Sequence, residues 1–230
     1  MTDYSSVYNS VTTELKSAYD ARAEERDSRP VHAWKQEQWA KFLDRLQVEN
    51  AARPPQGQQE GGGESTISLL DIGAGTGPAG RFFQDAGLAV VCTDLSPEMV
   101  RMCRAKGLEA YVMDFLHLDF PSGRFDALLA QNCLLHVPKV EFERVLQAIG
   151  RVVRAGGLLF IGGHGGQEFE GVWKEDHYEP KRFYALYSHE NLRSILERHF
   201  DIIEFEVIRS EGGRFGDIQA ITLRKREQQT

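Results

Sequence analysis

The chain has 230 residues, 41% of them hydrophobic, which is enough to bury one substantial core and favours a single decorated domain. Its formal net charge of −7 argues against a general binder of nucleic-acid phosphates, because such proteins present a basic surface. No apolar run reaches the length of a membrane span and the first residues lack a signal-peptide layout. We therefore expect a cytoplasmic protein with neither a nucleic-acid nor a membrane partner.

Two amphipathic helices are predicted near the start of the chain. Apolar residues recur at helical spacing over the first twenty residues and again from about His32 to Gln47, where Lys35 is expected on the outer face. A polar loop, Ala21 to Pro30, separates them. From about Ala51 to Ser65 the chain is rich in Gly, Gln and Pro, which is typical of a flexible linker. The expected division is a helical cap or lid at residues 1–50, a flexible linker at 51–66 and a core at 67–230.

A predicted strand from Ile67 to Ile72 runs into a glycine-rich turn that ends at Gly77. Glycine at every second position lets the backbone turn sharply and approach a ligand where a Cβ would clash. The next predicted helix, about Pro78 to Ala86, points its N-terminal N–H groups at this turn. A second strand then ends in Asp94, whose carboxylate can accept hydrogen bonds from both hydroxyls of a ribose. Together these features indicate a nucleoside-binding site.

The remaining elements continue the alternation of strands and helices. One helix is expected to start at the N-cap Ser96, and another, from Pro138, to close at Gly156-Gly157. A long irregular insertion is predicted from Gly162 to Pro180, followed by a last helix that starts at Ser188. Further strands are predicted at Glu109–Met113, Phe125–Gln131, Leu158–Ile161, Ile202–Ile208 and Ile218–Leu223. The expected fold class is α/β: a Rossmann-like, doubly wound, mostly parallel seven-stranded sheet with a C-terminal antiparallel hairpin joined around Gly212-Gly213 and an N-terminal helical cap.

From about Ser68 to the last strand, the chain resembles the class I S-adenosylmethionine-dependent methyltransferases. The motifs that carry the resemblance occur in the family's order: Asp71-Ile72-Gly73-Ala74-Gly75-Thr76-Gly77, Thr93-Asp94-Leu95-Ser96, Met113-Asp114-Phe115, Phe125-Asp126-Ala127-Leu128, Leu134-Leu135-His136-Val137 and Arg154-Ala155-Gly156-Gly157. The resemblance implies S-adenosyl-L-methionine as cofactor and S-adenosyl-L-homocysteine as product. It also implies transfer of a methyl group to an oxygen or nitrogen nucleophile of a small-molecule acceptor.

The resemblance further implies which residues bind the cofactor. Those expected around its methionine and sulfonium are Asp71 (behind the amino group), Gly73, Ala74, Gly75, Thr76, Gly77, Gln131 and Asn132. Those expected around its ribose and adenine are Asp94 (on the ribose hydroxyls), Leu95, Met99, Met113, Asp114 (on the adenine amino group) and Phe115. Tyr19 lies in a segment similar to the helix that folds over the cofactor in related enzymes, although Arg26 stands where a second tyrosine is common.

The acceptor site is expected in an insertion at residues 162–187, where Arg182 to Ser188 is similar to a subgroup of bacterial small-molecule methyltransferases. Arg182 can hold a carboxylate or phosphate bidentately, or it can form a surface salt bridge. Tyr184 can join an aromatic wall for a planar or cationic acceptor, or it can serve packing alone. The other aromatic candidates are Trp173, Tyr178, Phe183 and Tyr187. His136 can act as a general base, with a structural role as the alternative.

Two other classes share the physics of the glycine turn. A nicotinamide-dependent oxidoreductase would place its third glycine one residue later than Gly77, and a non-catalytic S-adenosylmethionine-binding protein would need no furnished acceptor region. We expect no metal, because His164, Glu168, Glu170 and His177 match no ligand spacing. Cys92, Cys103 and Cys133 are expected to be buried free thiols. A monomer or a homodimer is expected.

Overall fold

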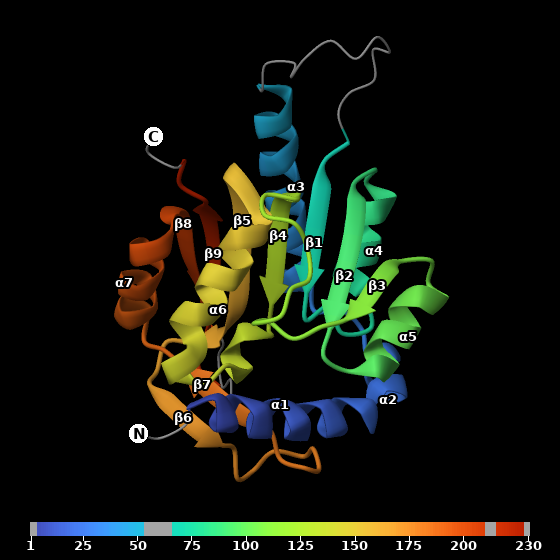
Figure 1. Cartoon of the computed structure of the whole chain (residues 1–230), viewed down its shortest axis with the longest axis vertical. Coiled ribbons are helices and arrows are strands. Elements are labelled where there is room, and N and C mark those ends of the chain that lie inside the picture. The colour runs from blue at the N-terminus through green and yellow to red at the C-terminus, as the bar shows by residue number, and fades with distance from the viewer. Residues whose placement is uncertain (1–3, 53–65, 210–214, 228–230) are drawn as a thin grey trace.

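The computed structural model describes residues 4–52, 66–209 and 215–227 (Figure 1). Its helices are α1 (Tyr4–Asp20), α2 (Ala23–Asp27), α3 (Ala33–Ala51), α4 (Pro78–Asp85), α5 (Pro97–Ala105), α6 (Lys139–Val152) and α7 (His189–His199), with a 3-10 turn, η1 (Leu134–His136). Its strands are β1 (Ser68–Ile72), β2 (Ala89–Asp94), β3 (Glu109–Val112), β4 (Phe125–Gln131), β5 (Val153–Gly165), β6 (Phe169–Val172), β7 (Phe183–Leu186), β8 (Asp201–Ile208) and β9 (Asp217–Arg224). Residues 53–65 of the predicted linker and the predicted turn at Gly212-Gly213 lie outside the described residues.

A seven-stranded sheet forms the centre of the fold, in the order β3-β2-β1-β4-β5-β9-β8. Strands β1 to β5 run parallel, whereas β9 is antiparallel to both of its neighbours, β5 and β8. The strand order reverses between β1 and β4, which is where open sheets of this kind bind ligands. The predicted Rossmann-like, doubly wound sheet with its C-terminal antiparallel hairpin is confirmed.

Both faces of the sheet are buried, as strands with near-continuous apolar runs require. Leu69 and Leu129 face a core shared with α3, α4 and α5, whereas their neighbours Leu70 and Leu128 face a core shared with α6 and α7. Figure 1 shows α6 in front of the sheet and α3 behind it. The three cysteines are free and buried, as predicted. Helices on both faces thus fix the parallel strands so that their carboxyl ends meet at one edge.

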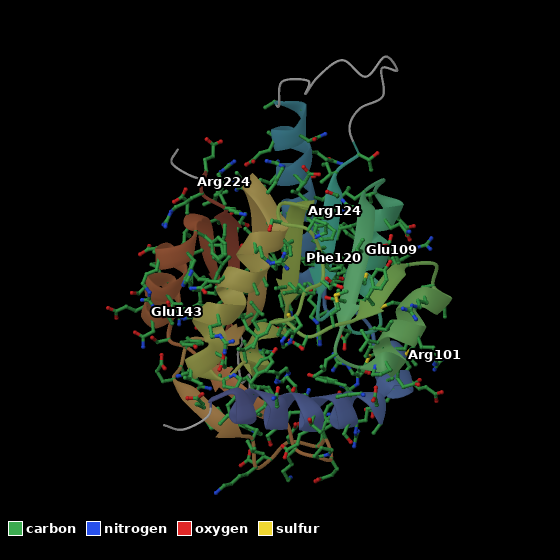
Figure 2. All side chains as sticks on the ribbon, viewed as in Figure 1. Arg101, Glu109, Phe120, Arg124, Glu143 and Arg224 are labelled. Atoms are coloured by element: carbon green, nitrogen blue, oxygen red, sulfur yellow. The ribbon has the colours of Figure 1, made fainter. Side chains whose placement is uncertain are left out.

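Helix α1 crosses the edge of the sheet at which the parallel strands end (Figure 1). Its inward residues recur every three or four positions and are buried; they are Tyr8, Val11, Leu15 and Ala18. At the end of α1, Asp20 accepts a hydrogen bond of 2.5 Å from Ser96 Oγ. Figure 2 shows side chains between α1 and the strand ends. Helices therefore occur at both places predicted for the cap, and α2 adds a third within the predicted polar loop.

Two sequence predictions on the β5 side of the sheet are wrong. The glycine pair expected to close α6 lies inside β5 instead, and Gly156 has φ +68° where the pairing of β4 with β5 shifts register. Glycine with positive φ serves a helix end and a bulge equally well, which explains the error. The predicted irregular insertion is also regular in part, because Gly162 to Gly165 extend β5 against β9. Strands β6 and β7 then pair as an antiparallel hairpin, the insertion hairpin (residues 169–186).

Candidate cofactor and acceptor site

The glycine turn after β1 leaves room for a ligand against its backbone. Gly73 and Gly75 both have φ +59°, and Gly77 has φ +84°, values that L side chains rarely adopt. A Cβ on Gly73 would lie 2.4 Å from Cys133 Cβ, so only glycine fits there. A Cβ on Gly75 would meet no atom within 4 Å, so this part of the turn faces open space. Helix α4 starts directly after the turn, as predicted.

Asp94 is positioned at the end of β2 by the backbone around it. Its two carboxylate oxygens accept hydrogen bonds from Gly75 N at 2.8 Å and from Ser96 N at 2.9 Å. Burial raises the pKa of Asp94 to about 6, although these hydrogen bonds oppose the shift. The Asp94 carboxylate therefore touches the glycine turn itself, which is where the sequence predicted a ribose.

Asp71 carries a buried acid group that accepts a hydrogen bond from the backbone of Gly80 and has one oxygen without a partner among the described residues. Its Oδ2 is shielded from solvent and has no hydrogen-bond partner within the described part of the chain. Burial, followed by the charge of Asp94, raises the pKa of Asp71 to about 8. Buried carboxylate oxygens are seldom left without a donor in native proteins. A ligand ammonium at this point would satisfy it, so the residues present fit the amino group of the expected cofactor.

Two cations border the same region, and the sequence did not single them out as site residues. Lys35 was expected on the outer face of its helix, but its side chain is half-buried, and burial together with the nearby charge of Arg26 lowers its pKa to about 8. Arg26 stacks 5.1 Å from the ring centre of Tyr19 and donates to Tyr178 Oη at 3.0 Å. Among the described residues, no carboxylate lies within ion-pairing distance of either cation. A sequence signal existed, since Lys35 stands one helical turn before the buried Trp39.

The residues predicted around the adenine differ in burial and in the hydrogen bonds they make. Met99 is buried in a small cluster against which Tyr19 packs. Asp114 is half-buried, and its carboxylate already accepts from Leu116 N at 2.8 Å and lies 2.8 Å from His117 Nδ1. Tyr8 of α1 also donates to Asp114, at 3.3 Å. An adenine amino group at Asp114 would thus share an acceptor that protein donors already use.

The remaining predicted cofactor residues line the same region. Ala74, Leu95, Met113 and Phe115 are half-buried, whereas Thr76 is buried. Phe115 reaches the glycine turn, because its Cζ would lie 3.4 Å from a Cβ on Gly73. The carbonyl of Thr76 accepts from Lys106 Nζ at 2.7 Å, and Lys106 also pairs with Asp27 of α2. Helix α2 is thereby tied to the glycine turn.

His136 is held between the cap and the insertion hairpin. Its Nδ1 lies 2.7 Å from the carbonyl oxygen of Phe183, and its Nε2 lies 2.7 Å from Tyr19 Oη. A carbonyl oxygen only accepts, so Nδ1 carries the proton and Nε2 accepts from Tyr19. Burial lowers the pKa of His136 to about 3, which keeps the ring neutral at physiological pH.

Arg182 is buried, and its charge is met by the protein itself. Its Nε and Nη2 donate to the two carboxylate oxygens of Asp176 at 2.8 and 2.9 Å, and its guanidinium stacks 3.7 Å from the ring centre of Tyr178. Burial raises the pKa of the Asp176 carboxyl, but the hydrogen bonds from Arg182 outweigh burial and hold that pKa at about 2. The bidentate face predicted for an acceptor carboxylate is therefore occupied by Asp176. Arg182 still donates to Tyr19 Oη, at 3.2 Å, through Nη1.

The ends of β4 and β5 bring further predicted residues together. Gln131 Oε1 accepts from Trp39 Nε1 at 2.7 Å, which fixes the amide of Gln131. Asn132 has φ +54°, and its backbone N–H donates to the carbonyl of Gly162 at 2.6 Å. Non-glycine residues with such φ values cluster at functional sites. Gln131 and Asn132 therefore stand at the carboxyl end of β4, beside Gly162 of β5.

The predicted aromatic residues separate into two groups. Trp173 and Tyr184 form a cluster with Phe215, a residue that the sequence did not reveal because it lies far along the chain. Tyr187 instead packs 5.0 Å from Phe142 in the core, and Tyr178 stacks on Arg182. We refer to Trp173, Tyr184 and Phe215 as the aromatic box. The predicted aromatic residues thus lie in different surroundings, and Tyr178 packs on Tyr19 at 5.6 Å.

Two hollows are present in the described part of the fold, and the first is lined in part by residues of the predicted acceptor insertion, among them His164 and Tyr187. A cavity of about 40 Å³ lies between the ends of β5 and β9, η1 and α6, which is room for only a few waters. A groove of about 480 Å³ separates α3 from β8 and β9, lined largely by charged residues. Across the described ranges, no group of three or more His, Cys, Asp and Glu is placed to hold a metal ion. No helix in those ranges is long and apolar enough to cross a membrane.

Comparison with known proteins identifies the central part of the chain. A family described as a methyltransferase domain matches residues 70–161. The demethylmenaquinone methyltransferase of Tropheryma whipplei is 32% identical over 134 residues, which are 56% of this chain and 50% of that protein. The ubiquinone biosynthesis O-methyltransferase of Xanthomonas oryzae is 31% identical over 100 residues, which are 40% of this chain and 41% of that protein. The chain thus spans half or less of the length of these two relatives.

Solved structures show the same fold over nearly the whole chain. One is the 1,6-didemethyltoxoflavin-N1-methyltransferase of Burkholderia thailandensis, bound to 1,6-didemethyltoxoflavin and S-adenosylhomocysteine; it has a TM-score of 0.69 at 19% identity and covers 96% of this chain and 91% of its own. Another is the N-methyltransferase NodS of Bradyrhizobium japonicum, with a TM-score of 0.61 at 13% identity, covering 91% of this chain and 100% of its own. Likeness at these identities concerns the fold alone. Residues 70–161 thus match a methyltransferase domain, and the chain has the Rossmann-like fold of these solved methyltransferases.

Proposed function

We propose that the protein transfers a methyl group from S-adenosyl-L-methionine to an oxygen or nitrogen nucleophile of a small-molecule acceptor. The observation that carries the proposal is the unpartnered Oδ2 of Asp71 behind a glycine turn that Asp94 also touches. Asp71 would be the anion that receives the cofactor's amino group, and Asp94 the anion that receives its ribose hydroxyls. The similarity to two quinone-pathway methyltransferases supports a small-molecule acceptor. The net charge of −7 speaks against a nucleic-acid acceptor.

When bound, S-adenosylmethionine supplies a methyl group on a positively charged sulfur, open to in-line attack by an acceptor lone pair. The chain's own contribution is to bind, orient and exclude water. Orientation of reactants can lower a barrier by roughly 7–11 kcal/mol. Asp71 would receive the cofactor's amino group and Asp94 its ribose hydroxyls. Lys35 and Arg26 are two cations without carboxylate partners among the described residues, so they would hold the cofactor's carboxylate.

A binding experiment separates this proposal from its alternatives. We expect isothermal titration calorimetry to detect S-adenosylhomocysteine binding and no comparable NAD binding. Tight NAD binding without S-adenosylhomocysteine binding would instead favour the nicotinamide-dependent oxidoreductase. Binding of S-adenosylhomocysteine with no methyl transfer to any acceptor in a small-molecule panel would favour a non-catalytic binding protein.

Cofactor binding should release a proton near neutral pH. The pKa of Asp71 is raised to about 8 in the ligand-free protein, and an ammonium at its Oδ2 would lower it. The bound state therefore holds fewer protons than the free state, so affinity should rise as pH increases from about 6 to 8. Calorimetry in buffers of different ionisation enthalpy at pH 7 would measure a release approaching one proton. The Asp71→Asn variant should release none; equal release from that variant would contradict the assignment.

For His136 we favour a positioning role over that of a general base. Its Nε2 lone pair is already engaged by Tyr19 Oη, and its pKa of about 3 makes it a weak proton acceptor. We expect the pH profile of kcat at saturating cofactor and acceptor to lack an inflection near the ordinary histidine pKa of about 6.5. An inflection there that disappears in His136→Gln, with turnover lost below it, would restore the general-base hypothesis.

A further inference from the structure

We infer that Tyr8 of α1 is an internal competitor of the cofactor. Before the cofactor binds, the Tyr8 hydroxyl takes the hydrogen-bonding positions that the adenine edge of S-adenosylmethionine would use, so adenine must displace it. The inference rests on the proposed function and goes beyond it, because it makes Tyr8 a determinant of cofactor affinity. This role is distinct from that of Tyr19, which lies near the other end of the same helix.

The Tyr8 hydroxyl makes contacts of two kinds after β3. It donates a hydrogen bond to Asp114 Oδ1 at 3.3 Å. Its oxygen also interacts with the backbone N–H groups of Phe115 and Leu116. Burial, followed by the charge of Asp114, raises the pKa of Tyr8, and these two N–H groups oppose the rise. One hydroxyl can make both kinds of contact, because a phenol is at once a donor and an acceptor.

Adenine presents the same pair of functions along one edge. Its exocyclic amino group donates hydrogen bonds, and the neighbouring ring nitrogen N1 accepts one. The amino group is predicted to donate to Asp114. N1 would then lie beside the backbone N–H groups with which the Tyr8 oxygen interacts. The hydroxyl of Tyr8 therefore reproduces the donor and acceptor pair of the adenine edge, at the residue that is predicted to bind it.

Asp114 has little acceptor capacity left while Tyr8 is in place. A carboxylate offers about four lone-pair sites. Besides Tyr8, Oδ1 accepts from Leu116 N at 2.8 Å and from His117 N at 3.1 Å, and Oδ2 lies 2.8 Å from His117 Nδ1. Tyr8 makes the longest of these contacts, and its oxygen also engages the N–H groups that N1 would need. Tyr8 is therefore the partner of Asp114 that adenine would replace.

The ring of Tyr8 lies in surroundings predicted for the adenine ring. Tyr8 is only 4% exposed and belongs to a buried apolar cluster. Met113 and Phe115, two predicted adenine contacts, are half-buried and pack against that cluster. A flat base bound to Asp114 would need the apolar surface that the flat phenol ring now covers. Adenine binding thus requires the whole Tyr8 side chain to move.

This displacement concerns the first half of α1 alone. The other end of the helix is held by Asp20, which accepts from Ser96 Oγ at 2.5 Å, and by Tyr19, whose Oη lies 2.7 Å from His136 Nε2. Neither contact uses Asp114. The cofactor would therefore exchange one set of hydrogen bonds at Asp114 for an equivalent set. Its apparent affinity is lower by the cost of releasing Tyr8.

Tyr8→Phe tests this cost, because it removes the competing hydroxyl and keeps the ring. We expect the dissociation constant for S-adenosylhomocysteine, measured by calorimetric titration, to fall about 5-fold or more. Tyr111→Phe is the matched control. The hydroxyl of Tyr111, on β3, donates to Glu109 at the protein surface, so its removal should change the dissociation constant less than about twofold.

The gain should depend on Asp114, for which both hydroxyl and adenine compete. Asp114→Asn removes the ionised acceptor. In that background, Tyr8→Phe should change the affinity for S-adenosylhomocysteine less than about twofold, since the two substitutions act on one interaction. A general loosening of the cap would instead raise the affinity equally in both backgrounds.

Fluorine NMR observes the displacement directly. Protein labelled with 3-fluorotyrosine gives a Tyr8 resonance that is assigned by its absence from the Tyr8→Phe spectrum. Saturating S-adenosylhomocysteine should move this resonance towards that of solvent-exposed fluorotyrosine, because the side chain leaves its buried place beside Asp114.

The outcomes separate the inference from the proposed function. If neither the unsubstituted protein nor Tyr8→Phe bound S-adenosylhomocysteine, the proposed function itself would be rejected. Three results would overturn the competitor role alone: binding by both proteins with equal or weaker affinity in Tyr8→Phe, an equal gain in both Asp114 backgrounds, or a Tyr8 resonance that the ligand leaves unchanged. Each would mean that Tyr8 stays beside Asp114 when the cofactor binds.

Discussion

Replacing Asp94 by alanine is expected to raise the dissociation constant for S-adenosylhomocysteine on the order of 10²- to 10³-fold. The two ribose hydroxyls would lose an ionised acceptor, and hydrogen bonds to charged groups are each worth about 1.5–3 kcal/mol. The same carboxylate holds Gly75 N and Ser96 N, so the glycine turn also loses an anchor. Calorimetric titration of S-adenosylhomocysteine into the variant measures the effect.

The loss should concern binding far more than folding. Burial raises the pKa of Asp94 to about 6, above its unfolded value of about 3.9, so its ionisation opposes folding as pH rises through that interval. Removing the charge at neutral pH offsets part of the cost of the lost backbone hydrogen bonds. Thermal unfolding of the ligand-free variant should therefore still show a cooperative transition.

A matched control separates this effect from a general change in charge. Asp85→Ala also removes a carboxylate, but Asp85 is an exposed partner of Arg81 on α4. The dissociation constant of Asp85→Ala for S-adenosylhomocysteine should stay within twofold of that of the unsubstituted protein. If Asp94→Ala bound S-adenosylhomocysteine as well as Asp85→Ala does, Asp94 would not be the ribose ligand.

The parallel half of the fold is predictable because each of its signals is local. A short buried strand is an apolar run ended by a turn residue, and β4, predicted as Phe125 to Gln131, has those bounds. Ser96 and Ser188 are visible as N-caps, and both accept the expected backbone hydrogen bond. The glycine turn is equally local, since alternating glycines need no distant partner to fold back. The positions of the candidate cofactor residues at strand ends can therefore be predicted from the sequence.

The acceptor side resists prediction because its contacts join distant segments. Phe215 meets Trp173 and Tyr184 across more than thirty residues, and no periodicity marks such a contact. Arg182 shows the same limit, because nothing local reveals that Asp176, six residues earlier, fills its fork. Lys35 was misplaced for a different reason, since a lysine is ordinarily assigned to solvent even when it stands on the buried stripe of its helix. Sequence patterns assign charged residues to the surface, so they mispredict charged residues whose side chains are buried.

Replacing Asp176 by alanine should destabilise the protein by about 3–5 kcal/mol, because it leaves the buried Arg182 cation without its anion. Arg182 is only 8% exposed, and Asp176 supplies both acceptors for its fork. The free energy of unfolding from urea denaturation at pH 7 measures the change. The double variant Asp176→Leu/Arg182→Met removes both charges and should recover much of this loss, since an apolar pair leaves no unpaired charge.

A surface pair gives the control for the same type of substitution. Glu143 lies at the outer edge of α6, half-exposed, and pairs with Arg198 at 2.7 Å (Figure 2). Glu143→Ala should cost only about 0–1 kcal/mol, as exposed ion pairs usually do. A similar small loss for Asp176→Ala would mean that solvent reaches Arg182 in solution and that the cap does not bury it.

The pH dependence of the free energy of unfolding gives an independent measure of how much the Asp176–Arg182 pair stabilises the protein. The pKa of Asp176 is about 2 in the folded protein and about 3.9 when unfolded, so the folded state binds fewer protons between those values. The stabilisation is therefore complete above about pH 4 and is lost as pH falls towards 2. Asp176→Ala should lack this contribution to acid unfolding. Because Arg182 also donates to Tyr19, which bonds His136, the variant should lose methyl transfer even at temperatures where it remains folded.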